Sequence, residues 1–316
     1  MNKIRRFFNQ NRKTILVAIL FIAFFIIILQ VLNYWAGLEQ EKNRNSISSR
    51  NDIFNQTTYK PSQSVITKQE VNENEYKIQS NVIDTFFSYC NSANVQNAYN
   101  LLSDECKEEM FPTLEYFKEN YYDKIFATTK LYTIQNWNNS TYRVKMKEDI
   151  LSTGKVNNNE ITEDYFTVVY STEGYKLNIN NYIGKVEINK ENEYKNIKLK
   201  VLSKNTYIDY EIYNLSVENK TENDILLDSR EKTDCIYLKD SKDVEYPSYS
   251  HELIDSSLIV RSGGNSNLSV KFTNSYVESR TIKILGFSDI ILNYYEYRNI
   301  SDKKQYMDRL KIEVDL

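Results

Sequence analysis

The chain has 316 residues and a formal net charge of −3 at pH 7. Residues 1–13 carry five basic side chains and no acidic one, so the rest of the chain sums to −8. This balance argues against nucleic acid as a partner, because counterion release on phosphate binding requires clustered lysines and arginines. One histidine and three unevenly spaced cysteines offer no multi-histidine or cysteine-rich metal site. We therefore expect no metal and no other cofactor.

The first element is an apolar run that predicts a transmembrane anchor at residues 14–33. Ile15–Leu29 contains no polar residue, and a helix of about 20 residues spans a bilayer core of about 30 Å. A cleaved signal peptide and a buried core helix are the alternatives, but Tyr34 and Trp35 are bulky where a cleavage site needs small residues. The positive-inside rule places residues 1–13 in the cytoplasm and the C-terminal domains outside the cell. The topology-setting residues are Lys3, Arg5, Arg6, Arg12 and Lys13.

Residues 34–75 are predicted to form a flexible tether. The segment is rich in Asn, Ser, Gln and charge, and its apolar interruptions, such as Ile53-Phe54 and Val65-Ile66, are short. Such a composition buries too little apolar surface to offset the entropy lost on folding. A random coil of this length reaches on the order of 30 Å, so the folded region would sit off the membrane.

A domain with helices first and strands afterwards is predicted for residues 76–183. Apolar side chains recur at helical spacing from Tyr76, and Ser103 and Thr113 are the expected N-caps of two further helices. After Thr128 the period changes to two, which indicates antiparallel strands. A hairpin is expected across Thr172-Glu173-Gly174. This order of elements is typical of an α+β domain.

The same region resembles the NTF2-like superfamily, in the form found as extracytoplasmic domains of Gram-positive membrane proteins. The resemblance rests on Ala98–Lys107, Phe111-Pro112-Thr113, Phe117 and Tyr121-Tyr122, followed by four strands. It implies a cone of helices on a curved antiparallel sheet that encloses a cavity. Similar domains occur in conjugative-transfer scaffold proteins, in wall-associated proteins and in a few isomerases and dehydratases, so the fold alone does not choose a function.

Residues 184–316 are predicted to form a second, all-β domain. Short strand candidates, among them Ile197–Leu202, Thr206–Val217 and Leu253–Val260, are separated by turn signals, which favours an antiparallel sandwich. Val217–Thr221 and Leu268–Phe272 resemble elements of immunoglobulin-like extracellular domains. The Cys-Trp-Cys framework of antibody domains is missing from the sequence.

Residues of the kinds that carry catalysis are sparse. The single histidine, His251, is far in sequence from any nucleophile motif, and we expect it to be a surface or core residue. An NTF2-like isomerase would instead use a buried carboxylate and a tyrosine. The side chains that could serve are Asp84, Glu105 or Asp123 with Tyr89, Tyr99 or Tyr121.

Three functions follow from these observations. The favoured prediction is a non-enzymatic, membrane-anchored binding or scaffold protein of a bacterial cell-envelope assembly, related to conjugative transfer or secretion and partnered by other envelope proteins. The second is an extracellular receptor for a small ligand or peptide, with the cavity lined by Tyr89, Tyr121 and Trp137. The third is the isomerase-like enzyme. We expect no catalytic residues under the first two.

Overall fold

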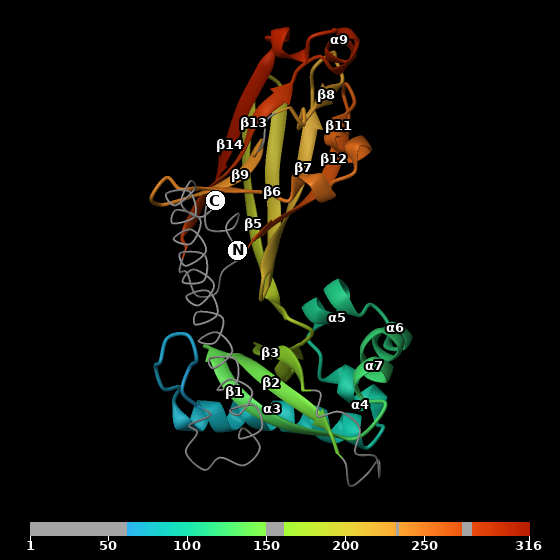
Figure 1. Ribbon diagram of the computed structural model, residues 1–316, viewed down its shortest axis with the longest axis vertical. Helices are drawn as coiled ribbons and strands as arrows, with labels where there is room; N and C mark the ends of the chain where they lie inside the picture. The colour runs from blue at the N-terminus through green and yellow to red at the C-terminus, as the bar shows by residue number, and fades with distance from the viewer. Residues whose placement is uncertain (1–61, 150–160, 232–233, 274–279) are drawn as a thin grey trace, which may run out of the picture. The chain divides into compact units, whose positions relative to one another are not determined.

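The computed structural model describes residues 62–149, 161–231, 234–273 and 280–316 (Figure 1). Residues Lys60–Leu316 form one compact unit. Its first strand-free stretch contains α3 (Glu73–Asn91), α4 (Val95–Asn100), α5 (Asp104–Met110), α6 (Leu114–Phe117), the π-helix η1 (Lys118–Tyr122) and α7 (Asp123–Ile125).

Side-chain caps explain why these helices start where they do. The side chains of Asn72, Asn94, Ser103 and Thr113 each accept a hydrogen bond from a backbone N–H of the first turn. Each cap satisfies a donor that would otherwise have no partner within the helix. The caps at Ser103 and Thr113 were predicted from the sequence and are confirmed.

An antiparallel sheet of four strands follows, in the order β1-β2-β3-β4. The strands are β1 (Lys130–Asn138), β2 (Thr141–Glu148), β3 (Thr162–Ser171) and β4 (Gly174–Asn178). One face of the sheet packs against α3 through a core rich in aromatic rings, in which Phe86 makes ring contacts with Phe117 and Phe166. The predicted hairpin across residues 172–174 is confirmed, since Ser171 pairs with Gly174.

Two further antiparallel sheets enclose a second core. One has the order β12-β7-β6-β5, with β5 (Tyr182–Tyr194), β6 (Ile197–Tyr207), β7 (Tyr210–Asn219) and β12 (Asn265–Thr273). The other has the order β10-β9-β13-β8-β11, and β14 (Arg309–Asp315) pairs with β13. Its remaining strands are β8 (Ile225–Leu226), β9 (Ile236–Asp240), β10 (Glu245–Pro247), β11 (Ile259–Val260) and β13 (Ile282–Ile291).

Four short helical elements lie among these strands: η2 (Ser250–Glu252), η3 (Asp255–Leu258), α9 (Tyr294–Asn299) and η4 (Lys303–Gln305). The strand predicted at Leu253–Val260 was wrong, because η3 occupies half of it and only Ile259 and Val260 belong to a strand. The predicted boundary at residue 184 falls inside β5, whose backbone pairing with β6 begins at Tyr182.

The predicted fold class is wrong for the residues that the structure describes. These residues are mostly β-sheet, and apart from α3 no described helix exceeds the seven residues of α5. The caps at Asn94, Ser103 and Thr113 divide the region after Asn91 into the short helices α4 and α5 and the continuous run of α6, η1 and α7. A cone of helices is therefore not shown. The immunoglobulin-like resemblance stays a prediction.

The predicted location is corrected as well. Across the described ranges, none of the helices is both long enough and apolar enough to cross a membrane. The predicted anchor at residues 14–33 and its five flanking basic residues lie outside the described ranges. The finding contradicts the predicted single-pass membrane location. The predicted tether, residues 34–75, enters the described part at residue 62, where it forms ordered structure.

Gly286 on β13 offers a test of the packing between two strands. It pairs with Tyr237 on β9, and a Cβ built at Gly286 would lie 2.4 Å from the Tyr237 ring. Tyr237 is buried, so its ring must shift. We expect Gly286→Ala to lower the free energy of unfolding by about 1–3 kcal/mol, the usual cost of overpacking. Chemical denaturation measures this change.

Gly184→Ala on β5 is the matched control, because its Cβ would meet its nearest atom at an ordinary 3.6 Å. A Gly286→Ala protein as stable as the Gly184→Ala protein would contradict the rigid ring contact.

Candidate functional site

One wall of a pocket in the described part of the chain is a tight hairpin at residues 62–72. Ser64 N–H donates to the Gln69 carbonyl at 2.9 Å, and Lys68 N–H donates back to the Ser64 carbonyl at 3.1 Å. Lys68 has a positive φ of 62°, which lets the chain reverse within a few residues. Val71 N–H donates to the Ser62 carbonyl at 3.0 Å and closes the hairpin.

This hairpin is held against the end of β1 by three hydrogen bonds. Val65 N–H donates to the Asn136 carbonyl at 3.1 Å, and Ile66 N–H donates to the Trp137 carbonyl at 3.4 Å. The Ser64 hydroxyl adds a bond of 2.8 Å to the same Trp137 carbonyl. The regular β1–β2 pairing is interrupted between Asn136 and Asn138. The hairpin thus covers the irregular end of the sheet.

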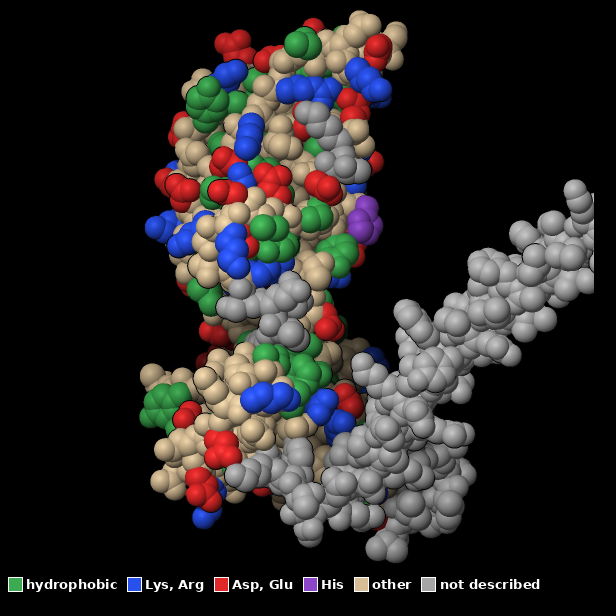
Figure 2. Space-filling model, turned by 60° about the vertical axis from the view of Figure 1, so that its left-hand side comes forward, with side chains coloured by type: hydrophobic (Ala, Val, Ile, Leu, Met, Phe, Trp, Pro, Cys, Tyr) green, Lys and Arg blue, Asp and Glu red, His purple; other side chains and the backbone are tan. Residues whose placement is uncertain are grey.

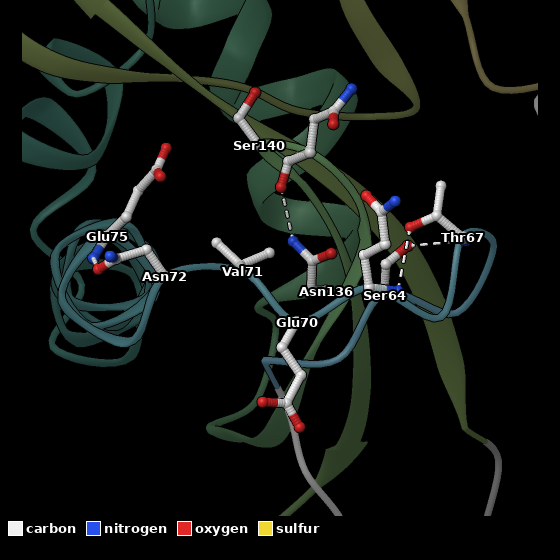
Figure 3. Close-up of a pocket in the computed structure, with 10 residues that line it drawn as sticks. Ser64, Thr67, Glu70, Val71, Asn72, Glu75, Asn136 and Ser140 are labelled. Carbon is white, nitrogen blue, oxygen red and sulfur yellow. Dashed lines mark hydrogen bonds between the residues drawn. The ribbon is translucent and has the colours of Figure 1, made fainter.

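Between the hairpin, the start of α3 and the β1–β2 turn lies a cavity of about 380 Å³ (Figure 3). A volume of this size is in the range of sites for small molecules. Nine of its ten lining residues are polar or charged, and Val71 is the one apolar side chain. The lining residues are Ser64, Thr67, Gln69, Glu70, Val71, Asn72, Glu75, Asn136, Asn139 and Ser140.

Asn136 is the unusual residue of this pocket. Its side chain is fully buried, and its Nδ2 donates to the Asn139 carbonyl at 2.6 Å. Its Oδ1 has no hydrogen-bond partner. Exchanging the two amide atoms would set Oδ1 against the Asn139 carbonyl, acceptor against acceptor, so the orientation follows from the bond that is made. Figure 3 shows the amide of Asn136 lying between Val71 and Ser64.

A buried acceptor without a partner has a cost of about 1–3 kcal/mol. Buried polar side chains in folded proteins are therefore nearly always bonded, and an exception calls for an explanation. For Asn136, the explanation that the surroundings favour is a donor supplied from the cavity.

Two neighbours connect Glu75 to the base of the pocket. The buried Gln79 donates from Nε2 to Oε1 of Glu75 at 2.9 Å. The Tyr142 hydroxyl, next to Asn136 across the β1–β2 pair, donates to Oε1 of Gln79 at 2.6 Å. Burial raises the pKa of Tyr142, so its phenol stays a neutral donor. The Glu75 carboxylate is thereby oriented through one of its two oxygens.

The three tyrosine and tryptophan side chains predicted as cavity lining do not line this pocket. Tyr121 packs within the core around Phe86, and Tyr89 on α3 is half-buried against that core. Trp137 comes closest, because its carbonyl holds the hairpin while its ring contacts Tyr165 and lies near the Arg143 guanidinium. A common cavity for the three side chains stays a prediction.

The carboxylates considered for an isomerase are exposed. Asp84 accepts a hydrogen bond from the Tyr132 hydroxyl at 2.7 Å, and Asp123 pairs with Lys118, also at 2.7 Å. Glu105 lies on the exposed face of α5. His251 is exposed and contacts the Tyr249 ring. The visible face in Figure 2 shows acidic and basic side chains intermixed rather than gathered by sign.

Asp164 on β3 is a buried carboxylate that the sequence did not single out. Its Oδ2 accepts from the Tyr121 hydroxyl at 2.7 Å, and backbone N–H groups of Tyr165, Asn180 and Asn181 complete its bonding. Burial raises the pKa of Asp164 to about 6, against the lowering effect of these four donors.

Both carboxylate oxygens of Asp164 therefore accept hydrogen bonds from groups of the protein itself. Asn180 and Asn181 both have positive φ, and the carboxylate holds their backbone N–H groups in the turn between β4 and β5. The arrangement is that of a structural acid that fixes a strained turn.

Comparisons of the chain with protein-family models, with curated proteins and with solved structures find no match.

Proposed function

We propose that this chain is a binding protein whose site is the pocket under the hairpin at residues 62–72. The ligand is small and polar, and it donates a hydrogen bond to Asn136. The observation that carries the proposal is the buried, unpartnered Oδ1 of Asn136 in the wall of a polar cavity of about 380 Å³. A ligand donor at this atom would recover most of the cost of the missing bond.

The lining favours recognition of a polar molecule over an apolar one. Hydroxyl, amide and carboxylate groups surround the cavity, and Val71 is its one apolar side chain. Polar groups at fixed positions select a ligand through its hydrogen bonds, since any group left unpaired weakens binding. The scaffold role in an envelope assembly and the isomerase-like alternative rest on the sequence and stay predictions.

The test compares wild-type protein with Asn136→Ala in a thermal-shift screen. A panel of small amines, polyols, amides and free amino acids is added at increasing concentration. We expect at least one compound to raise the Tm of the wild type by a few degrees at about ten times its Kd. The same compound should leave the Tm of Asn136→Ala unchanged.

Asn136→Ala should itself fold normally. It removes one hydrogen bond and one unpaired acceptor together, so we expect its stability to change by less than about 1 kcal/mol. Asn214→Ala on β7, remote in sequence from every lining residue, is the control and should retain the ligand-induced shift. If no compound shifts the wild type, or if the shift persists in Asn136→Ala, the proposal fails.

A further inference from the structure

We propose that the group bound at Asn136 is a primary ammonium, so that the ligand is a small amine. This inference rests on the proposed function, because it assumes that the pocket binds a ligand. It names the chemical class that the hydrogen bonds and charges of the lining select.

On the hairpin wall, the Ser64 hydroxyl is already used within the protein. The Ser64 hydroxyl donates to the Trp137 carbonyl and accepts from Thr67 N–H. On the sheet side, Nδ2 of Asn136 donates to the Asn139 carbonyl. What Asn136 leaves for a ligand is its Oδ1, which can only accept. The ligand group must therefore be a donor.

The charges of the lining have one sign. Its ionisable side chains are Glu70 and Glu75, and none of its residues is basic. Glu75 uses Oε1 for the bond from Gln79, and its second oxygen remains for a ligand. In Figure 3 the Glu75 side chain rises beside the cavity, whereas the Glu70 carboxylate is turned away from Asn136. Glu75 is therefore the carboxylate that attracts a cation into the pocket.

An ammonium group matches this lining better than other polar groups do. It carries three donors, no acceptor and a positive charge. A ligand hydroxyl brings lone pairs that need donors of their own, and a ligand carboxylate would face Oδ1 and Glu75 with repulsion. A guanidinium is also a cation, but its planar fork is best matched by a carboxylate bound through two oxygens. One oxygen of Glu75 is already engaged by Gln79.

Three probes of equal chain length test the inference on the full-length protein at pH 7: 1-butylamine, 1-butanol and butyrate. Binding is followed by the indole N–H signal of Trp137 in nuclear magnetic resonance, assigned with Trp137→Phe. Trp137 adjoins Asn136 and holds the hairpin through its carbonyl, so an occupied pocket should shift this signal. We expect butylamine to bind at least about tenfold more tightly than butanol, and butyrate not to bind.

Two isosteric variants separate the roles of the two carboxylates. Glu75→Gln should weaken butylamine binding by roughly two- to fivefold, as expected for an ion pair made by an exposed carboxylate, and added salt should weaken wild-type binding in the same direction. Glu70→Gln is the matched control and should change the affinity by less than about twofold, because its carboxylate points away from Asn136.

The inference is overturned if butanol or butyrate binds as tightly as butylamine, or if Glu75→Gln and Glu70→Gln behave alike. The affinities of agmatine and putrescine are compared to test whether a guanidinium is preferred to an ammonium. Tighter binding of agmatine would also overturn the inference. If binding is lost in Asn136→Ala, any of these results would leave the proposed function standing. Loss of every Asn136-dependent binding signal would instead remove the proposed function itself.

Discussion

Asn219→Ala should lower the free energy of unfolding by about 3–5 kcal/mol. Asn219 is fully buried at the end of β7, and its Nδ2 donates to the carbonyls of Asn223, Val260 and Arg261. Its Oδ1 accepts from the backbone N–H and the hydroxyl of Thr221. One amide thus joins the loop after β7 to the segment after β11. Alanine would leave the buried Val260 carbonyl without this donor and would remove the part-buried bonds to the other groups.

Urea denaturation followed by circular dichroism measures the effect. Asn214→Ala, on the same strand, is the matched control: Asn214 is half-buried and bonds only the hydroxyls of Ser203 and Ser269, so we expect a loss below about 1.5 kcal/mol. A loss below 1 kcal/mol at Asn219 would contradict the role of this amide. The contrast with Asn136→Ala is informative, because both asparagines are buried but only Asn219 has its full set of bonds.

Local features of the fold could be predicted from the sequence. The caps at Ser103 and Thr113 and the hairpin at residues 172–174 depend on side chains within a few positions of one another. Alternation along β2 was visible for the same reason, since Tyr142, Val144 and Met146 all fall on the buried face. Such signals need no knowledge of the partner segment.

Features that depend on distant segments could not be predicted. The polar composition of residues 62–72 indicates a flexible tether, yet the hairpin is ordered by three hydrogen bonds to Asn136 and Trp137, about 70 positions later. The sequence of residues 62–72 does not indicate that they pair with the end of β1. The cone of helices failed because helical spacing after Asn91 continues across caps that end each helix.

The site residues were missed because polar residues on a strand are ordinarily read as its solvated face. Asn136 follows Ile134 at a spacing of two, and Asp164 precedes Phe166 and Val168 at the same spacing. Each is therefore in phase with the buried side of its strand. A polar residue in phase with apolar neighbours is a usable signal of a buried polar group. It does not tell whether the group is bonded within the protein, like Asp164, or left for a ligand, like Asn136.

Asp164 should also make the stability of the protein depend on pH. Its pKa is about 6 in the folded chain, raised by burial from the ordinary value of 3.8. The folded state therefore holds a proton between these values that the unfolded state has released. By linkage, the contribution of Asp164 to stability is full below about pH 4 and is lost as pH rises through 6. Two pH units at 1.4 kcal/mol each give an expected loss of about 3 kcal/mol.

The Asp164→Asn variant isolates the contribution of Asp164 to stability. Its asparagine side chain cannot ionise, and the other groups titrate alike in both proteins. The difference in unfolding free energy, wild type minus Asp164→Asn, should fall by about 2–3 kcal/mol between pH 4 and pH 7 in urea titrations. In Tyr121→Phe the fall should extend to higher pH, since the lost phenol donor favours the carboxylate. A difference that stays constant with pH would mean that Asp164 ionises as it does in water, and the buried carboxylate would then have to be solvated or paired with a cation. The difference in unfolding free energy could also stay constant with pH in the wild type and fall only after Tyr121 is replaced by Phe. The hydrogen bond from the Tyr121 hydroxyl would then offset the whole effect of burial on the pKa of Asp164.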